Sequence, residues 1–170
     1  MAHGGPNLEK WQNKIVATDL RQNFAISMLK QVLISLKKLH SLGYSHGDLK
    51  LGNICAKMSH NGSFKFILID FGLSAKLAEL GKNYGNLIFR GNMLFASIEH
   101  IMRSRVSQLD DLYSLLCVAY YFVKGTLPWI AYIDLIHNNK NLSPQKNLYR
   151  VDRYITLRII KRDEFNQELI

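Results

Sequence analysis

The sequence predicts a mainly α-helical domain that contains one small β-hairpin. Helical periodicity is present over residues 19–42 and again over residues 110–124. Between these segments, two short, largely apolar stretches at 54–58 and 64–69 flank a turn with Asn61 and Gly62, as in a hairpin. Polar residues gather at the two ends of the hairpin, so we expect the functional site there.

The composition fits one folded domain or a large part of one. The chain has 170 residues, 48% of them hydrophobic, and a net charge of +9. This charge favours anionic partners, but the basic residues are scattered and form no Arg-rich run. We therefore interpret the charge mainly as a solvated surface and do not expect a nucleic-acid partner.

The chain shows no membrane or export signal. Its N-terminus has no apolar signal region, and its longest apolar stretch, Leu115–Val123, is about half of what spans a bilayer. Cys55 and Cys117 are far apart and lack the spacing of a zinc site. We expect an intracellular, cytoplasmic protein, present also in the nucleus, with buried apolar cysteines, no disulfide and no membrane contact.

The first long helix is expected over residues 19–42. Thr18 or Asp19 can cap its start, and Gly43 can end it in a left-handed turn. Lysines occupy the faces of the wheel that the apolar residues leave free. The apolar residues that recur at helical spacing are Phe24, Met28, Leu29, Val32, Leu33, Leu36 and Leu39.

The hairpin brings two distant polar residues together. Asn53 precedes its first strand, and Asp70 follows its second strand, seventeen residues later. Because paired strands lie about 4.8 Å apart, both side chains can reach one metal site.

The C-terminal half contains a second helix and a long irregular segment. Residues 73–109 have little periodicity and predict an irregular surface segment. Residues 110–124 are apolar nearly all round, as in a helix buried in the middle of a domain, and Gly125 ends it.

Beyond Leu127-Pro128-Trp129, the pattern predicts a polar linker and another helix. Trp129 is expected to be packing. The linker covers residues 138–145, and the helix covers residues 149–160 with Leu157 and Ile160 directed inward.

Three polar residues have the spacing used for phosphoryl transfer on ATP. Asp48 is followed five residues later by Asn53, and Asp70 directly precedes Phe-Gly. In catalytic loops of this kind, the first Asp orients the substrate hydroxyl, while the Asn and the second Asp hold magnesium.

These motifs, in this order, resemble the eukaryotic protein kinases and more narrowly the casein kinase 1 family of serine/threonine kinases. The resemblance implies a kinase-like C-terminal lobe, a helical bundle whose small hairpin carries the catalytic and metal loops. It extends over residues 4 to 130. The segments that carry it are Gly5–Glu9, Tyr44–Asn53, Asp70–Leu73, Gly91–Ile98, Asp110–Leu115 and Lys124–Trp129.

The resemblance implies a role for each site residue. Asp48 would orient and accept from the substrate hydroxyl, and Lys50 would neutralise the transferring phosphate. Lys50, Asn53 and Asp70 would bind the ATP cofactor, with Asn53 and Asp70 holding Mg²⁺. In supporting roles, His46 would pack beside Phe71, Gly72 would let the metal loop turn at positive φ, and Asp111 would anchor the catalytic loop through backbone hydrogen bonds.

The chain also departs from the family pattern. Residues 1–170 contain no Gly-rich phosphate loop, strand lysine or helix glutamate, so we expect an incomplete kinase domain without its N-terminal lobe and terminal helices. Positioning of ATP supplies nearly all of phosphoryl-transfer catalysis, so such a chain should turn over little by itself. A partner covering the missing-lobe surface would be consistent with this.

Three smaller departures bear on regulation and substrate choice. Gly47 stands where an Arg normally reads a phosphate on the activation loop, which disfavours that regulation. Asn92 stands in place of a Thr that bonds the catalytic Asp, and Leu94 stands in place of an Arg that binds primed substrates.

Two other functions remain open from the sequence. One is a non-catalytic, pseudokinase-like binding module that uses the surface of the absent lobe. The other is a small-molecule phosphotransferase of the aminoglycoside or choline kinase type, which shares the His46-Gly47-Asp48 spelling. The segments Ala96–Ile98 and Gly125–Trp129 belong instead to the protein-kinase pattern, with protein serine or threonine as substrate.

Overall fold

The computed structural model describes residues 4–77, 89–103, 106–133 and 144–168. The chain divides into two compact units, residues 1–125 and residues 126–170, which we describe separately. The described part is mainly helical with small antiparallel sheets, as expected from the sequence.

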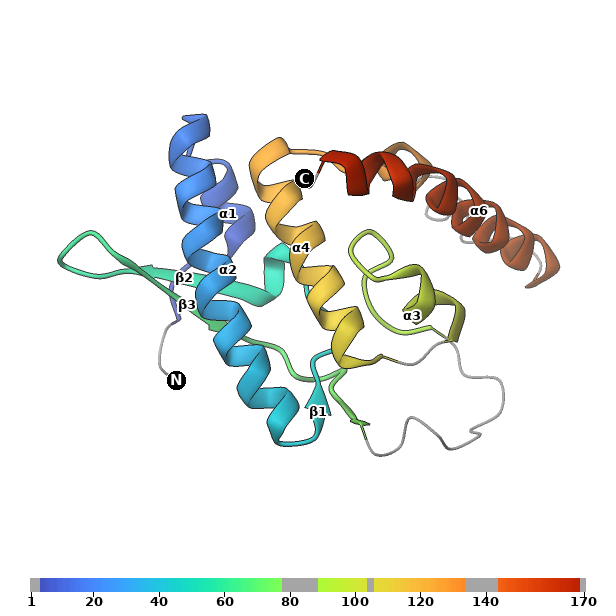
Figure 1. The fold of residues 1–170 in the computed structure, drawn as a ribbon, viewed down its shortest axis with the longest axis horizontal. Coiled ribbons are helices and arrows are strands. Elements are labelled where there is room, and N and C mark those ends of the chain that lie inside the picture. Colours follow the sequence, from blue (N-terminus) through green and yellow to red (C-terminus); the bar gives the residue numbers. More distant parts are fainter. Residues whose placement is uncertain (1–3, 78–88, 104–105, 134–143, 169–170) are drawn as a thin grey trace. The chain divides into compact units, whose positions relative to one another are not determined.

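Unit 1 is built around two long helices that lie side by side (Figure 1), α2 (Thr18–Ser41) and α4 (Gln108–Lys124). The predicted span of α2 is right to within one residue, and Gly43 ends it at φ 82°. The predicted cap is wrong, because Ala17 is the N-cap and no side chain bonds the first turn. The shorter helices of this unit are α1 (Leu8–Gln12) and α3 (Ile98–Arg103).

Two antiparallel ribbons frame the loops between α2 and α3. Strands β2 (Ile54–Met58) and β3 (Phe64–Leu68) form the predicted hairpin, with Ile54 opposite Leu68. Strand β1 (Tyr44–Ser45) pairs with β4 (Ala75–Lys76), and the short helix η1 (Leu51–Asn53) leads into β2. The chain therefore enters the first loop and leaves the second one at the same ribbon.

An aromatic cluster fixes the hairpin to the two long helices. The ring of Phe24 on α2 lies 4.7 Å from that of Phe64 and 4.9 Å from that of Phe66, both on β3. It also stacks on Phe122 of α4 at 4.9 Å. Such pairs stabilise beyond the area they bury, so the hairpin has one position relative to the helices. Cys55 and Cys117 belong to the same core, and both are buried as expected.

Helix α4 begins two residues earlier than predicted because of a capping box. The Ser107 side chain accepts from the Asp110 backbone N–H, and the Asp110 carboxylate accepts from the Ser107 N–H. The predicted burial all round is wrong, since Leu109 is 75% and Leu116 43% exposed. Gly125 ends the helix at φ 75°.

The region expected to be irregular contains regular elements. Strand β4 and helix α3 lie within residues 73–109, where no helical or strand period is visible in the sequence. Residues 78–88 and 104–105 of that segment lie outside the described residues.

Unit 2 contains η3 (Ile130–Tyr132) and α6 (Pro144–Glu168). Because α6 starts at Pro144, the predicted linker is too long at its end, while its residues 138–143 lie outside the described part. The inward face of α6 was predicted wrongly, since Ile160 is 64% exposed and Leu157 is half-buried. The residues that pack inward are Tyr154, Arg158 and Phe165, with Arg158 over the buried ring of Trp129.

Across the described residues, none of the helices combines the length and the apolar character needed to cross a bilayer.

Candidate active site

The catalytic loop places Asp48 in a buried, hydrogen-bonded position. Its Oδ2 atom lies 2.6 Å from Lys50 Nζ and 3.0 Å from Asn53 Nδ2, and Asn53 Nδ2 also donates to the Asp48 carbonyl at 2.9 Å. Its other oxygen, Oδ1, is buried and has no hydrogen-bond partner among the described residues. The three residues predicted for this loop are therefore in direct contact, and one acceptor atom of the carboxylate is left over.

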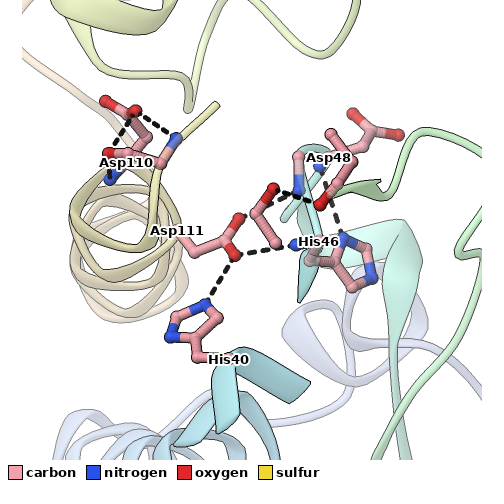
Figure 2. A network of polar contacts seen from close by, with 9 residues as sticks. His40, His46, Asp48, Asp110 and Asp111 are labelled. Atoms are coloured by element: carbon pink, nitrogen blue, oxygen red, sulfur yellow. Dashed lines mark hydrogen bonds and ion pairs between the residues drawn. The ribbon is translucent and has the colours of Figure 1, made fainter. Parts of the chain in front are cut away.

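Asp111 connects this loop to helix α4. Its Oδ2 atom accepts from the His46 backbone N–H at 2.7 Å, and its Oδ1 atom accepts from the Gly47 N–H at 2.9 Å (Figure 2). The carboxylate is 1% exposed, so these charge-assisted bonds are formed away from water. One side chain of a rigid helix thus fixes the backbone directly before Asp48.

The imidazole of His46 bridges the catalytic loop and the metal loop. Its Nδ1 atom accepts from the Asp48 N–H at 3.3 Å, and its Nε2 atom lies 3.2 Å from the Ile69 carbonyl. These contacts fit the neutral ring with its hydrogen on Nε2. Burial lowers the pKa of His46, although Asp111 opposes the shift. The ring also lies 5.1 Å from that of Phe71, with which it was predicted to pack.

Gly47 occupies a position that only glycine fits. Its φ is 78°, and a Cβ atom there would lie 2.8 Å from the Leu73 carbonyl oxygen. An arginine, which related loops carry at this place, would meet the same backbone oxygen. The glycine is therefore matched to the close approach of the two loops.

The metal loop differs from the expectation in where it turns. Asp70 itself has a positive φ of 63°, whereas Gly72 does not. The prediction that Gly72 supplies a positive φ is thus wrong; a Cβ on Gly72 would instead lie 3.2 Å from Asp70 Oδ1. Asp tolerates the left-handed region better than most residues because its short side chain bonds locally, here to the Gly72 N–H at 3.3 Å.

Asn53 and the metal loop are held together through the backbone. The Ile69 N–H donates to the Asn53 carbonyl at 3.0 Å, one residue before Asp70. The Asn53 amide nitrogen is used by Asp48, so its oxygen is the side-chain atom that can bind a cation. Asp70 is exposed and contributes a carboxylate.

This donor set fits Mg²⁺ bound together with phosphates. Mg²⁺ prefers oxygen ligands and is usually held by one or two carboxylates plus substrate phosphate oxygens and water. Consistent with this, the described residues contain no group of three or more His, Cys, Asp or Glu side chains that could hold a metal alone.

Sequence reasoning missed His40. Its Nε2 atom lies 2.8 Å from Asp111 Oδ2, so it supports the carboxylate that holds the catalytic loop (Figure 2). One signal was available, because His40 follows the buried Val32 and Leu36 at helical spacing and so continues the inner face of α2. Its partner is 71 residues away and could not be inferred locally.

The neighbouring acid, Asp110, was quoted in a motif but given no role. It is 7% exposed and accepts from the Ser97 hydroxyl and from Ser107. It therefore fixes the start of α3 to the start of α4, while Asp111 faces the catalytic loop.

Comparisons with known proteins agree with this geometry. The sequence profile of the protein kinase domain matches residues 3–170. A casein kinase 1-like protein of Oryza sativa subsp. japonica is 31% identical over 138 residues, which is 75% of this chain and 19% of that protein. A candidate casein kinase I of Caenorhabditis elegans is 34% identical over 111 residues, which is 63% of this chain and 32% of that protein.

A probable serine/threonine-protein kinase of fowlpox virus is 34% identical over 121 residues. The alignment covers 66% of this chain and 39% of the viral protein. The chain thus spans well under half the length of each of these curated relatives.

Proposed function

The chain belongs to the protein kinase family, and from this premise we propose that it is the lower lobe of a serine/threonine kinase of casein kinase 1 type. Its reaction would be transfer of the γ-phosphoryl group of ATP to a protein hydroxyl, in the cytoplasm and also the nucleus. As residues 1–170 alone, it would bind ATP weakly and turn over slowly.

The unpaired Oδ1 atom of Asp48 is the observation that carries the proposal. An unsatisfied buried acceptor costs about 1–3 kcal/mol, so a carboxylate built for structure alone would be expected to use both oxygens. Here Lys50 and Asn53 occupy Oδ2 and fix the plane of the carboxylate. Oδ1 is left to accept the hydrogen of a substrate hydroxyl, as a positioned base does.

Lys50 and the metal residues would act on the other side of the reaction. Lys50 is partly exposed and lies within one hydrogen bond of Asp48, so its ammonium can neutralise a phosphoryl group next to that carboxylate. The Asn53 oxygen and the Asp70 carboxylate would hold Mg²⁺, which supplies charge neutralisation between the phosphates when bound. The Asp111 and His46 contacts would keep the loop in position.

The casein kinase 1 assignment is supported by the motifs and by the names of two relatives, not by contacts to a substrate. Protein serine or threonine is favoured over an amino sugar or choline because the segment 91–98 and the helix α4 follow the protein-kinase pattern. The name of the viral relative points to serine or threonine as well.

A chimera tests this proposal. The upper lobe of a casein kinase 1 would precede Gly4, and transfer of labelled phosphate from Mg²⁺-ATP would be measured on casein and on a panel of amino sugars. We expect labelling of casein on Ser or Thr, lowered at least about 100-fold by Asp48→Asn. Labelling of amino sugars alone would assign the small-molecule class, and absence of magnesium-dependent nucleotide binding would refute both.

One observation favours a second function, a non-catalytic binding module. Ile69 and Phe71 flank Asp70 and are 38% and 50% exposed, so apolar side chains border the metal loop. A partner could cover them without any transfer reaction. A chimera that binds such a partner but neither nucleotide nor Mg²⁺ would favour this function.

A further inference from the structure

A groove runs between α2 and α4 in unit 1, apart from the exposed metal loop. It lies between the last turns of α2 and the first turns of α4 and encloses about 480 Å³. It does not depend on the proposed phosphoryl transfer. The described residues that line it are Leu33, Lys37, His40, Ser41, Gln108 and Leu112.

The walls of the groove continue into exposed apolar side chains. On α4, Leu109 and Leu116 lie three residues before and four residues after Leu112, so the three share one face, and the outer two are 75% and 43% exposed. On α2, Leu33 and Ile26 are seven residues apart and are 43% and 50% exposed. Single exposed leucines need no explanation, but a row on each side of one groove marks an interaction surface.

The shape and the backbone of the groove favour a helix as its occupant. Both walls are α-helices, whose backbone groups are already paired within each helix, so an extended strand laid between them would find no hydrogen-bond partners. A third helix satisfies its own backbone and fits its side-chain ridges into the groove.

The charges around the groove select the kind of helix. Lys37 lines it and His40 lies at its floor, and none of the described lining residues is acidic. Lys30 lies seven residues before Lys37 and extends the basic edge along the same side of α2. We propose that this groove docks an acidic amphipathic helix of a partner protein, whose apolar face contacts Leu33 and Leu112 and whose carboxylates face Lys37.

The test uses a labelled synthetic peptide of about 18 residues that places leucines on one helical face and glutamates along its flank. Its binding to the whole chain is followed by fluorescence anisotropy. We expect Leu33→Ser and Lys37→Glu each to weaken binding roughly tenfold, since one removes apolar contact and the other reverses the charge. Circular dichroism checks that each variant is folded.

The same helix offers matched controls one residue further along. Ile34 is 69% exposed and Lys38 is exposed, yet neither lines the groove, because each is turned about 100° from its neighbour. Ile34→Ser and Lys38→Glu should leave binding within about twofold. A peptide with lysines in place of the glutamates should bind Lys37→Glu better than it binds the original chain.

Several outcomes would overturn the proposal. They are no binding of the peptide, equal binding of a scrambled peptide that lacks the apolar face, and equal losses in the controls. Sedimentation showing a dimer that Leu33→Ser abolishes would instead assign the groove to a second copy of the chain.

Discussion

The catalytic loop and the metal loop lie next to each other, yet the chain holds them very differently. In the catalytic loop, Asp48 is 6% exposed and bonded to Lys50 and Asn53, and the backbone before it is fixed by Asp111. In the metal loop, Asp70 is exposed, and among the described residues its carboxylate accepts only from the Gly72 N–H.

The difference shows which part of the site the chain completes by itself. The catalytic loop is preorganised by protein atoms, as positioning of a substrate hydroxyl requires. The carboxylate of the metal loop is left available, as a Mg²⁺ ligand should be in a site where phosphates complete the shell.

Removal of the Asp111 anchor would break this comparison most strongly. Asp111→Ala leaves the buried N–H groups of His46 and Gly47 without acceptors, so we expect a loss of about 3 kcal/mol or more of unfolding free energy. Urea unfolding measures it. Asp19→Ala, which removes an exposed acid from the first turn of α2, should cost less than about 1 kcal/mol. Equal losses would mean that Asp111 does not anchor the loop.

The two glycines at either end of β1 separate backbone conformation from crowding. Gly43 and Gly47 have φ values of 82° and 78°, but a Cβ on Gly43 meets nothing within 4 Å, whereas one on Gly47 meets the Leu73 carbonyl. Gly43→Ala should cost about 1 kcal/mol from the left-handed backbone alone. Gly47→Ala should cost at least about 1 kcal/mol more, because the backbone of the metal loop must move as well. Thermal unfolding of both variants checks the order, and equal costs would show that the loops do not crowd each other.

The smallest effect concerns pH and the bridge made by His46. Its pKa is lowered in the folded state, mainly by burial, so below about pH 6.5 the unfolded chain binds a proton that the folded chain does not. Stability should therefore fall as the pH drops below about 6.5 and be fully recovered above it. Protonation would also place a hydrogen on Nδ1, facing the Asp48 N–H.

His46→Gln isolates this contribution. Gln retains one donor and one acceptor but does not titrate, so the loss of stability between about pH 7.5 and about pH 5.5 should be smaller by about 1 kcal/mol in the variant. His100, whose pKa burial also lowers, contributes equally to both proteins and cancels. Parallel pH profiles for the two proteins would argue against a titrating bridge at His46.

Local patterns were enough to predict the elements that carry the site. The hairpin registers Ile54 against Leu68, and this follows from apolar runs on both sides of Asn61-Gly62. Gly43 and Gly125 end the two long helices as expected, because a left-handed turn depends on the local residue.

The features that were missed depend on contacts far apart in the chain. The turn at Asp70 rather than Gly72, the His40 contact with Asp111 and the exposed side of α4 are set by neighbours that periodicity does not specify. An apolar stripe such as Leu109–Leu116 states what a helix face prefers, not whether anything covers it.

Binding of Mg²⁺-ATP to the chimera and to two variants, measured by titration calorimetry, tests the division between the loops most directly. Asp70→Asn should weaken nucleotide binding at least about tenfold and remove its dependence on magnesium, since a metal ligand is lost. Asp48→Asn should keep the affinity within about threefold while phosphoryl transfer is lost, because Asp48 acts on the hydroxyl. Equal effects of the two substitutions on binding, or no dependence on magnesium in the parent protein, would contradict the account.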